Sequence, residues 1–552
     1  MKKDHYFYLL IVALALLPLL DFLNPGFPVT HDGQDHIARI ANFYRNMSEG
    51  VLIPRWAGNL NWGYGHPILM FLYPFPSYLA SFFHFIGFSF VNSTKLVFMS
   101  TYIASAVVMY LWVREFLDKK AGLIASLIYI LAPYRFVDLY VRGAIGEHVA
   151  FIFPPMILYF LLKLSKKFSI WYFLGGSLSL ALLILSHNAI SLMFIPLILI
   201  YIAYQVYYSK DRKALIYQYT CMLVFGFGLS AFFWIPAFME GKYTLRDIVT
   251  TKDYAERFVD IEDLFSLSWS YGGTNLLSKQ IGLIHWVFIF WGIIMLLTNF
   301  IKDKKNIILL GLSLLMFFTS LYLMTAYSKI FWDNLSIVQK FQFPWRFLSL
   351  SVFLTALIGG IVAKSFPRKF SFLFCLITII SLLLANKDYW HAKGYLNKPE
   401  SFFTSIYHGT TDTGESSPIW SVRFMERRAN YNLEVIEGSI KIDELERKST
   451  RHIYILDAKR RSRVRENTLY FPGWKVFVDK KQIPIEFQDP ANRGLITFFV
   501  ESGRHEVEIV LEDTKLRYLA NLLSLFSLIL LPFYGILINR KYVFPFNRTR
   551  HS

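Results

Sequence analysis

The sequence predicts an α-helical protein that crosses the membrane about twelve times and carries a β-rich domain outside it. The chain has 552 residues, of which 55% are hydrophobic and only 17% are charged. Its apolar residues fall in blocks of about 17 to 25, the length that spans a bilayer. One stretch, 387–515, is instead charged and alternates between apolar and polar residues in the manner of strands.

The apolar blocks define the membrane helices in order. Twelve segments are suitable for crossing: 6–23, 94–114, 121–140, 148–164, 170–186, 188–208, 215–237, 282–300, 306–325, 345–364, 369–386 and 516–538. A further apolar stretch, 67–88, contains Pro67, Pro74 and Pro76, which remove backbone donors that lipid cannot replace. We therefore expect 67–88 to be re-entrant or interfacial.

The positive charges predict how the chain is threaded. The formal net charge is +18, but most Lys and Arg residues lie in short clusters between apolar blocks, as in cytoplasmic loops of membrane proteins. If 67–88 does not cross, one side receives the N-terminus and the clusters at 114–120, 163–167, 209–213, 302–305, 364–369 and from 539 onward. The sequence thus predicts a multi-pass protein of the cell membrane with both termini in the cytoplasm, and no nucleic-acid partner.

The opposite side receives the polar residues that anchoring does not explain. It holds the loops 24–93, 135–148, 186–188, 238–281 and 339–346 and the stretch 387–515. The predicted organisation is a membrane domain over 1–386 with the external first loop 24–93, an extracytoplasmic β-rich domain over 387–515, and a final helix with a basic cytoplasmic tail over 516–552.

The stretch 387–515 predicts a β-sandwich-like domain. Period-two runs occur at 432–438, 452–458, 474–479, 495–501 and 505–512, bounded by turn residues such as Gly473 and Gly494.

The first loop holds the densest group of ionisable residues, in the stretch THDGQDHIARI. If a helix covers 30–46 with Thr30 as its N-cap, five side chains share one face within an arc of about 140°. They are His31, Asp32, Asp35, His36 and Arg39. Two carboxylates on one face suit a general base and a substrate-orienting or metal-binding group, with the histidines assisting. The alternative is a capping cluster, which explains one aspartate but not two adjacent histidines.

Downstream, the segment 53–67 is rich in Trp, Tyr, Gly and Asn and begins with Arg55 and Trp56. Such a surface suits stacking on sugar rings, with these two residues binding substrate. An ordinary interfacial aromatic belt is the alternative.

A second group of candidates lies in RGAIGEH, where Arg142, Glu147 and His148 fall near a helix start. Ionisable residues at membrane depth are costly and suggest function. A capping Glu beside a snorkelling Arg is the alternative. His187, at another helix boundary, is more simply explained by a hydrogen bond.

A third candidate is FPWRF, which places Arg346 beside Trp345. Arg suits phosphate oxygens and stacks on aromatic rings. An interfacial anchor is the alternative.

The chain contains no Walker motif, Rossmann glycine signature or HExxH. These absences argue against ATP-driven transport, dinucleotide chemistry and zincin proteolysis. Any energy the reaction needs should come with its substrate.

Taken together, these motifs resemble a known family. The set HDGQDHIAR, IPRW…GYGHP…FLYPFPSYL, APYR…RGAIGEH, FPWRF and YFPGWKVFVD…NRGLITFFVESGRHEVEIVL resembles the prokaryotic membrane proteins related to 6-pyruvoyl-tetrahydropterin synthase and their YfhO-like relatives. More broadly, the arrangement is similar to the GT-C class of membrane glycosyltransferases. The pterin label does not imply that activity, because the soluble enzyme binds zinc through three histidines for which this chain offers no soluble domain.

The resemblance implies sugar transfer from a polyprenyl-phosphate donor to an envelope glycan, lipid or protein on the extracytoplasmic face. Asp32 matches the base or metal-ligand carboxylate of the class and Asp35 its supporting carboxylate, while Arg142 and Arg346 are donor-phosphate candidates. A divalent metal at Asp32 and Asp35 is a candidate cofactor, and membrane lipid a partner. The alternatives are a transporter or flippase of lipid-linked sugars and a non-catalytic envelope assembly protein.

Overall fold

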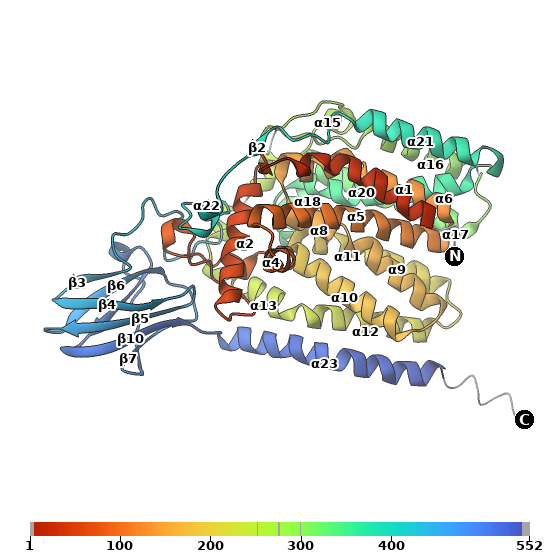
Figure 1. Cartoon of the computed structure of the whole chain (residues 1–552). Helices are drawn as coiled ribbons and strands as arrows, with labels where there is room; N and C mark the ends of the chain where they lie inside the picture. Colours follow the sequence, from red (N-terminus) through yellow and green to blue (C-terminus); the bar gives the residue numbers. More distant parts are fainter. Residues whose placement is uncertain (1–4, 251, 274–275, 299, 544–552) are drawn as a thin grey trace, which may run out of the picture.

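The computed structural model describes residues 5–250, 252–273, 276–298 and 300–543. A bundle of helices carries a β-domain at one end, and the first helix, α1 (His5–Leu16), begins at the other end (Figure 1). The last helix, α23 (Lys515–Val543), runs back from the β-domain along the bundle (Figure 1). Both termini of the described chain thus lie at the end opposite the strands.

Every predicted membrane segment is helical. Seven helical stretches within the described residues are long and apolar enough to cross a membrane. They are His5–Leu23, α5 (Phe90–Phe116), Ile145–Lys166, α11 (Asn188–Tyr207), α17 (Lys304–Met324), Pro344–Ser365 and Lys515–Leu537. Two bent pairs raise this number to nine. They join α6 (Lys119–Ile130) to Pro133–Arg142 at 49° and α12 (Arg212–Leu229) to α13 (Ala231–Met239) at 68°.

Three shorter apolar helices complete the set. They are α10 (Ile170–Ser186), α16 (Leu283–Leu297) and α21 (Ser371–Asn386). The helical class is confirmed, while the number of twelve crossings stays a prediction, because three of the twelve segments are shorter than the span length.

The segment 67–88 forms two short helices, α3 (Ile68–Phe71) and α4 (Phe75–Phe85). With 11 residues, α4 is about 16 Å long, roughly half the hydrocarbon thickness. Pro74 and Pro76 lie at its start, where a missing donor costs little. Its length favours the re-entrant or interfacial interpretation.

The basic clusters meet at the end of the bundle away from the strands. Glu115 lies 3.2 Å from Lys163 Nζ and 2.8 Å from Lys166 Nζ, and Lys364 Nζ lies 3.0 Å from Asp118. These pairs join three of the clusters predicted to share one side. The basic residues at 2–3 and in 544–552 lie outside the described residues.

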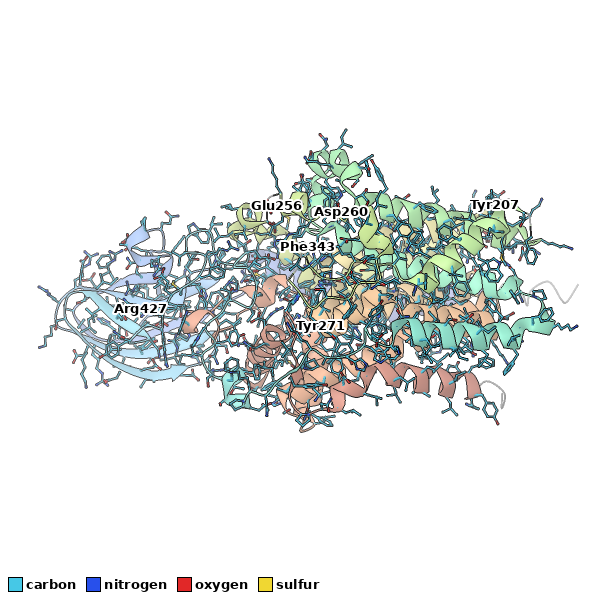
Figure 2. The ribbon with its side chains drawn as sticks, turned by 90° about the horizontal axis from the view of Figure 1, so that it is seen from above. Tyr207, Glu256, Asp260, Tyr271, Phe343 and Arg427 are labelled. Atoms are coloured by element: carbon cyan, nitrogen blue, oxygen red, sulfur yellow. The ribbon has the colours of Figure 1, made fainter. Side chains whose placement is uncertain are left out.

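The predicted external loops meet at the other end. Figure 2 shows Arg427 at the sandwich end of the molecule and Tyr207 at the opposite end, with Phe343 and Tyr271 between them. The arrangement agrees with the predicted alternation of loops. Which end faces the cytoplasm stays a prediction.

The helix of the first loop, α2, covers Gly33–Ser48. Our expectation that it begins at Thr30 was wrong: Asp32 is the N-cap residue, and Thr30 Oγ1 instead accepts a hydrogen bond from Gly33 N at 3.1 Å. Gly143, with φ +66°, permits the close approach of Thr30, because a Cβ there would lie 2.3 Å from Thr30 Oγ1. His31 and Asp32 therefore precede the helix.

The β-domain is a sandwich of two antiparallel sheets. One sheet has the order β4-β5-β10-β7-β8 and the other β3-β6-β9. The strands are β3 (Leu433–Glu437), β4 (Ile440–Arg447), β5 (Arg451–Ala458), β6 (Ser462–Leu469), β7 (Trp474–Val478), β8 (Lys481–Ile483), β9 (Leu495–Val500) and β10 (Gly503–Leu511). The five period-two runs correspond to β3, β5, β7, β9 and β10, whereas β4, β6 and β8 were not predicted.

The chain before β3 packs on the first loop and does not join the sandwich. There β2 (Tyr395–Leu396) pairs antiparallel with β1 (Phe27–Pro28), and α22 (Glu400–Thr404) follows. Asn59 and Tyr407 exchange a further backbone contact, in which Tyr407 N donates to Asn59 O at 2.8 Å. The predicted external domain is thus built on the first loop.

The start of α23 is anchored by buried charges. Arg517, fully buried, donates from Nε to Glu240 Oε2 at 2.8 Å and from Nη2 to Pro472 O at 2.6 Å. This contact joins the sandwich exit to the end of α13.

Candidate functional site

The first loop and the RGAIGEH segment are held together by their backbones. His31 N donates to Val141 O at 2.9 Å and Asp32 N donates to Arg142 O at 2.8 Å. Val141 and Arg142 belong to η3 (Val137–Arg142), a short π-helical turn, a form that is rare and often found at functional sites. Two motifs far apart in sequence therefore share one place in the fold.

A buried ion cluster surrounds Arg142. Its Nη1 lies 2.7 Å from Asp138 Oδ1 and 2.7 Å from Glu147 Oε2, and both carboxylates are fully buried. Tyr134 OH donates to Glu147 Oε1 at 2.7 Å. Such a cluster is stable only when every charge is paired, so these four groups orient one another.

The FPWRF segment completes this cluster from the other side. Ser349 Oγ donates to Glu147 Oε1, and the Arg142 guanidinium lies 4.6 Å from the centre of the Trp345 ring. Ser349 follows the motif directly on α20 (Leu348–Ser365). The structure thus brings together Arg142, Glu147 and Trp345, as three predicted site residues.

Arg346 keeps unused donors. Its Nη1 donates to Phe341 O at 2.9 Å, while its Nε is buried without a hydrogen-bond partner. The guanidinium packs 4.6 Å from the centre of the Phe343 ring. No carboxylate of the described chain lies within ion-pair distance of it, so the group suits an external anion.

Three further side chains, those of His36, Tyr73 and His187, interact electrostatically with this cluster. His36 is buried, and burial lowers its pKa well below the usual value, with Arg39 and Arg142 lowering it further. The ring is therefore neutral at physiological pH. Tyr73 stacks on His187 with ring centres 4.9 Å apart.

Tyr73 lies within the electrostatic reach of both sides of the site. Burial raises the pKa of its hydroxyl, Asp32 raises it further, and Arg39, Arg346 and Arg142 oppose that rise. Sequence reasoning missed Tyr73, although a tyrosine beside Pro74 in a broken apolar segment was a usable signal. The predicted hydrogen bond of His187 is confirmed: its Nδ1 accepts from Ile190 N at 3.2 Å, which caps α11.

The two aspartates of the first loop differ in environment. Asp35 Oδ1 accepts a hydrogen bond from Tyr407 OH at 2.7 Å. Burial raises the pKa of Asp35, and the nearby charge of Asp32 adds to that rise, while Tyr407 and Arg39 oppose it. The side chain of Asp32 is partly exposed and accepts no hydrogen bond from the described residues. Asp32 is therefore open to a substrate, whereas Asp35 is held in place.

Arg39 lies beneath these aspartates. Its Nη2 donates to Thr411 O at 2.8 Å, and its Nε is buried without a partner. Arg39, His36 and Tyr73 line a cavity of about 20 Å³, which is room for about one water. A sugar would therefore bind at the outer surface, where His31 is exposed and Asp32 partly so.

The residues do not form a complete metal site by themselves. Nowhere in the part of the chain that the structure describes do three His, Cys, Asp or Glu side chains come together to hold an ion. An ion at Asp32 and Asp35 would need water or substrate phosphate as further ligands, a mode that Mg²⁺ uses.

Three predicted substrate-binding residues lie away from this cluster. Arg55 Nε lies 3.2 Å from Asp513 Oδ1 and Arg55 Nη2 donates to Asn521 Oδ1 at 2.8 Å, so it anchors α23. His148 Nε2 lies 3.0 Å from Phe98 O, against α5. A role of Arg55 and His148 in substrate binding stays a prediction. Trp56 is buried against Trp474.

Comparison with known proteins gives one weak sequence relative. An uncharacterized protein of Lactococcus lactis subsp. cremoris (strain MG1363) is 23% identical over 265 residues, which cover 47% of this chain and 43% of the relative. The match thus spans less than half of either protein.

Several solved structures resemble the chain, and three of them illustrate the likeness. The Archaeoglobus fulgidus oligosaccharyltransferase has a TM-score of 0.44 at 14% identity, covering 74% of this chain and 58% of its own. The arabinofuranosyltransferase AftD from Mycobacteria has a TM-score of 0.43 at 12% identity, covering 69% and 27%. ArnT from Cupriavidus metallidurans, bound to undecaprenyl phosphate, has a TM-score of 0.37 at 14% identity, covering 72% and 67%.

A family model gives the firmest result. Residues 69–392, more than half of the chain, match the family described as 6-pyruvoyl-tetrahydropterin synthase related domain, membrane protein. That range contains both bent helix pairs and the segments RGAIGEH and FPWRF, and thus the buried ion cluster. The predicted resemblance is confirmed: the chain belongs to this family of membrane proteins related to 6-pyruvoyl-tetrahydropterin synthase.

Proposed function

We propose that this membrane protein transfers a sugar from a polyprenyl-phosphate donor to an envelope glycan, lipid or protein on the extracytoplasmic face. The observation that carries the proposal is that an unpartnered carboxylate, Asp32, and an arginine with an unpartnered donor, Arg346, lie on segments that meet at the buried ion cluster. Asp32 N donates to Arg142 O, and Ser349, three residues after Arg346, donates to Glu147. Tyr73 lies within electrostatic reach of both. A base and an anion ligand are what glycosyl transfer from a phosphate donor requires.

The reaction would proceed by displacement at the anomeric carbon. Asp32 takes the proton of the acceptor hydroxyl as the oxygen attacks that carbon, and the bond from the carbon to the donor phosphate oxygen breaks. The leaving group is the polyprenyl phosphate, whose charge the Arg346 guanidinium stabilises. No nucleotide is needed, since the phosphate is already an activated leaving group.

The other residues of the site act by positioning. Tyr407 holds Asp35 in the first turn of α2 through a hydrogen bond, three residues after Asp32. Glu147 holds Arg142, whose carbonyl accepts from Asp32 N. Movement of either pair would displace the base, and displacements of about 1 Å can cost about 10²-fold in rate.

A flippase or transporter of lipid-linked sugars is the second candidate. Arg135 and Asp138 are fully buried within the bent helix pair, and two N–H groups of Arg135 lack partners. Buried ionisable residues at membrane depth are common in transport pathways. A non-catalytic assembly protein would instead tolerate loss of Asp32 and Asp35 together.

The deciding experiment is a transfer assay. The purified chain in detergent is given a labelled polyprenyl-phosphate sugar and membranes from cells that lack the gene, and release of polyprenyl phosphate and labelling of the envelope are measured. Asp32→Asn should lower transfer by about 10²-fold or more, the usual contribution of a positioned base.

Asp211→Asn is the matched control. Asp211 caps α12 by accepting from Ala214 N, and Asn caps equally well, so transfer should not change. Full activity of folded Asp32→Asn would remove the proposed base. A transporter would move donor across vesicles without releasing polyprenyl phosphate.

A further inference from the structure

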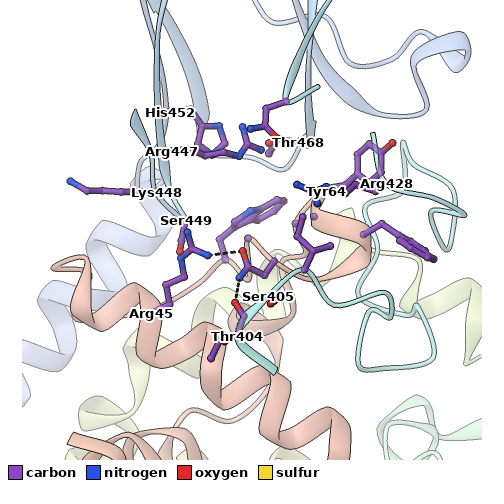
Figure 3. Close-up of a pocket in the computed structure, with 18 of the residues that line it drawn as sticks. Arg45, Tyr64, Thr404, Ser405, Arg428, Arg447, Lys448, Ser449, His452 and Thr468 are labelled. Carbon is purple, nitrogen blue, oxygen red and sulfur yellow. Dashed lines mark hydrogen bonds between the residues drawn. The ribbon is translucent and has the colours of Figure 1, made fainter. Parts of the chain in front are cut away.

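A second site lies between the first loop and the sandwich. A pocket of about 590 Å³ opens there, within the size range of small-ligand sites. Figure 3 shows Arg447, His452 and Thr468 entering it from the sandwich, Arg45 from α2, Thr404 from the end of α22, and Ser405 just after that helix. Of the residues predicted to bind substrate, Trp56 alone lines it.

Aromatic rings form one wall of the pocket. The Trp62 indole stacks on His408 with ring centres 3.8 Å apart and planes 11° apart. Trp62 has φ +61°, a left-handed conformation that costs a non-glycine residue free energy and is common at functional sites. The fold therefore holds this ring, with a flat apolar surface, in a strained position at the pocket.

Four cationic side chains are among the residues that line the pocket, and no residue of its described lining carries a carboxylate. Arg447 Nη1 donates to Glu466 Oε1 at 2.8 Å and Arg45 Nε donates to Glu49 Oε1 at 3.0 Å. These acids lie behind the pocket and orient the guanidinium groups. Arg428, exposed at the rim, has no ion-pair partner within the described chain.

The pocket is built by backbone contacts between distant segments. Trp62 N donates to Tyr407 O at 3.0 Å, and Leu469 N donates to Tyr64 O at 2.9 Å. Asn59 accepts from Arg45 Nη1 and donates to Thr404 O, both at 2.8 Å (Figure 3). A site fixed in this way loses little entropy when a ligand binds.

We propose that this pocket binds an oligosaccharide that carries phosphate or carboxylate groups. A sugar ring has a flat C–H face that can pack on Trp62, hydroxyls that can bond to Asn59 and Ser405, and an anionic group that matches Arg428 and Arg447. The binding requires no transfer reaction. Its use as the holding site for the acceptor glycan rests on the proposed function.

The test is calorimetric titration of the full chain in detergent. Trigalacturonate is the charged probe, maltotriose the neutral probe, and inorganic phosphate the anion alone. We expect trigalacturonate to bind at least tenfold more tightly than either of the others, and to weaken in about 0.5 M salt because exposed charges are screened.

Variants locate the binding. Arg428→Ala and Trp62→Leu should each weaken trigalacturonate binding about fivefold or more, whereas Arg504→Ala, on the exposed face of β10, should leave it unchanged. Asp32→Asn should also leave it unchanged, which separates this site from transfer. Since Arg428 is exposed and unpaired, its loss should not impair folding.

Four outcomes would overturn the proposal. The first three are absence of trigalacturonate binding, equally tight binding of maltotriose, and equally tight binding of inorganic phosphate. The fourth comes from a flotation assay with phosphatidylglycerol vesicles: Arg428→Ala loses its association with the vesicles but still binds trigalacturonate. The last would assign the cations to the lipid surface.

Discussion

Arg142 Nη1 lies 2.7 Å from Glu147 Oε2 across the turn that separates η3 from the next helix. Glu147 also accepts from Tyr134 and Ser349, so one buried carboxylate joins three segments of the chain. The pair is an organising contact of the candidate site, because Arg142 O accepts the amide of Asp32.

Glu147→Gln should destabilise the folded protein by about 1.5–3 kcal/mol, because Tyr134 and Ser349 lose a charged hydrogen-bond acceptor while Arg142 keeps Asp138 as its partner. Thermal unfolding in detergent measures this loss. Glu115→Gln is the control, because Glu115 also serves two cations but at the surface, where a pair contributes about 0–1 kcal/mol. Similar melting of the two variants would contradict the buried-pair argument.

Tyr407→Phe should move the acidic limb of the pH–rate profile of transfer to higher pH. The Tyr407 hydrogen bond lowers the pKa of Asp35 against the effect of burial, so its loss lets that pKa rise further, and ionised Asp35 then appears only at higher pH. Tyr271→Phe, which removes a hydroxyl bonded to His391 O, should leave the profile in place. An unchanged profile for Tyr407→Phe would mean that Asp35 need not be ionised.

Arg346→Ala should raise the KM for the donor by about tenfold or more and lower kcat, because the leaving phosphate loses a charge-assisted hydrogen bond. Arg257→Ala is the matched control. Both guanidinium groups pack on Phe343, at 4.6 Å and 4.8 Å from its ring centre, but only Arg346 lies within the electrostatic reach of Tyr73. Equal effects would assign Arg346 to packing on Phe343.

The sandwich should lose stability in acid through Glu466. Burial alone would raise the pKa of Glu466, but His452 and Arg447 outweigh it and hold that pKa at about 2, below the ordinary 4.5. A depressed folded-state pKa contributes stability that is present above pH 4.5 and is lost as pH falls toward 2. A fragment of residues 431–512 should show strand-dominated circular dichroism and this acid transition, and Glu466→Gln should flatten the dependence over that window. A helical spectrum would refute independent folding.

A reporter fused after Asp388 or within 440–500 should report an external location, and one after Lys120 a cytoplasmic one. The two positions lie at opposite ends of the bundle (Figure 1), and the basic clusters favour the cytoplasm for the second. A cytoplasmic signal from 440–500 would reverse the threading and remove the proposed extracytoplasmic reaction.

The sequence predicted what depends on local periodicity. Apolar length located every helix of the described chain that is long and apolar enough to cross a membrane, and strict alternation located β5, β7 and β10. Strand β6 was missed because its sequence SRVRENTL places Glu466, a charged residue, at a position the fold buries. Its partners Arg447 and His452 lie on other strands, and no local pattern announces that compensation.

The site was predicted in part for the same reason. Clusters of ionisable residues marked Asp32, Arg142 and Arg346, yet the contacts that join them depend on packing between distant segments. Ser349 reaches Glu147 across 202 positions and Tyr407 reaches Asp35 across 372. The ion pair of Arg55 with Asp513 was not predicted either, because no local pattern places two residues so far apart in sequence beside each other.

The buried pair of Glu240 and Arg517 can form only at the end of synthesis. The two residues are separated by 277 positions, and the ribosome synthesises Glu240 first. Until the sandwich has emerged and α23 follows it, Glu240 is a carboxylate without its cation. In the nascent chain the surface of α13 that later packs on α23 is therefore uncovered. The contact between these two helices forms only after the last helix has been synthesised.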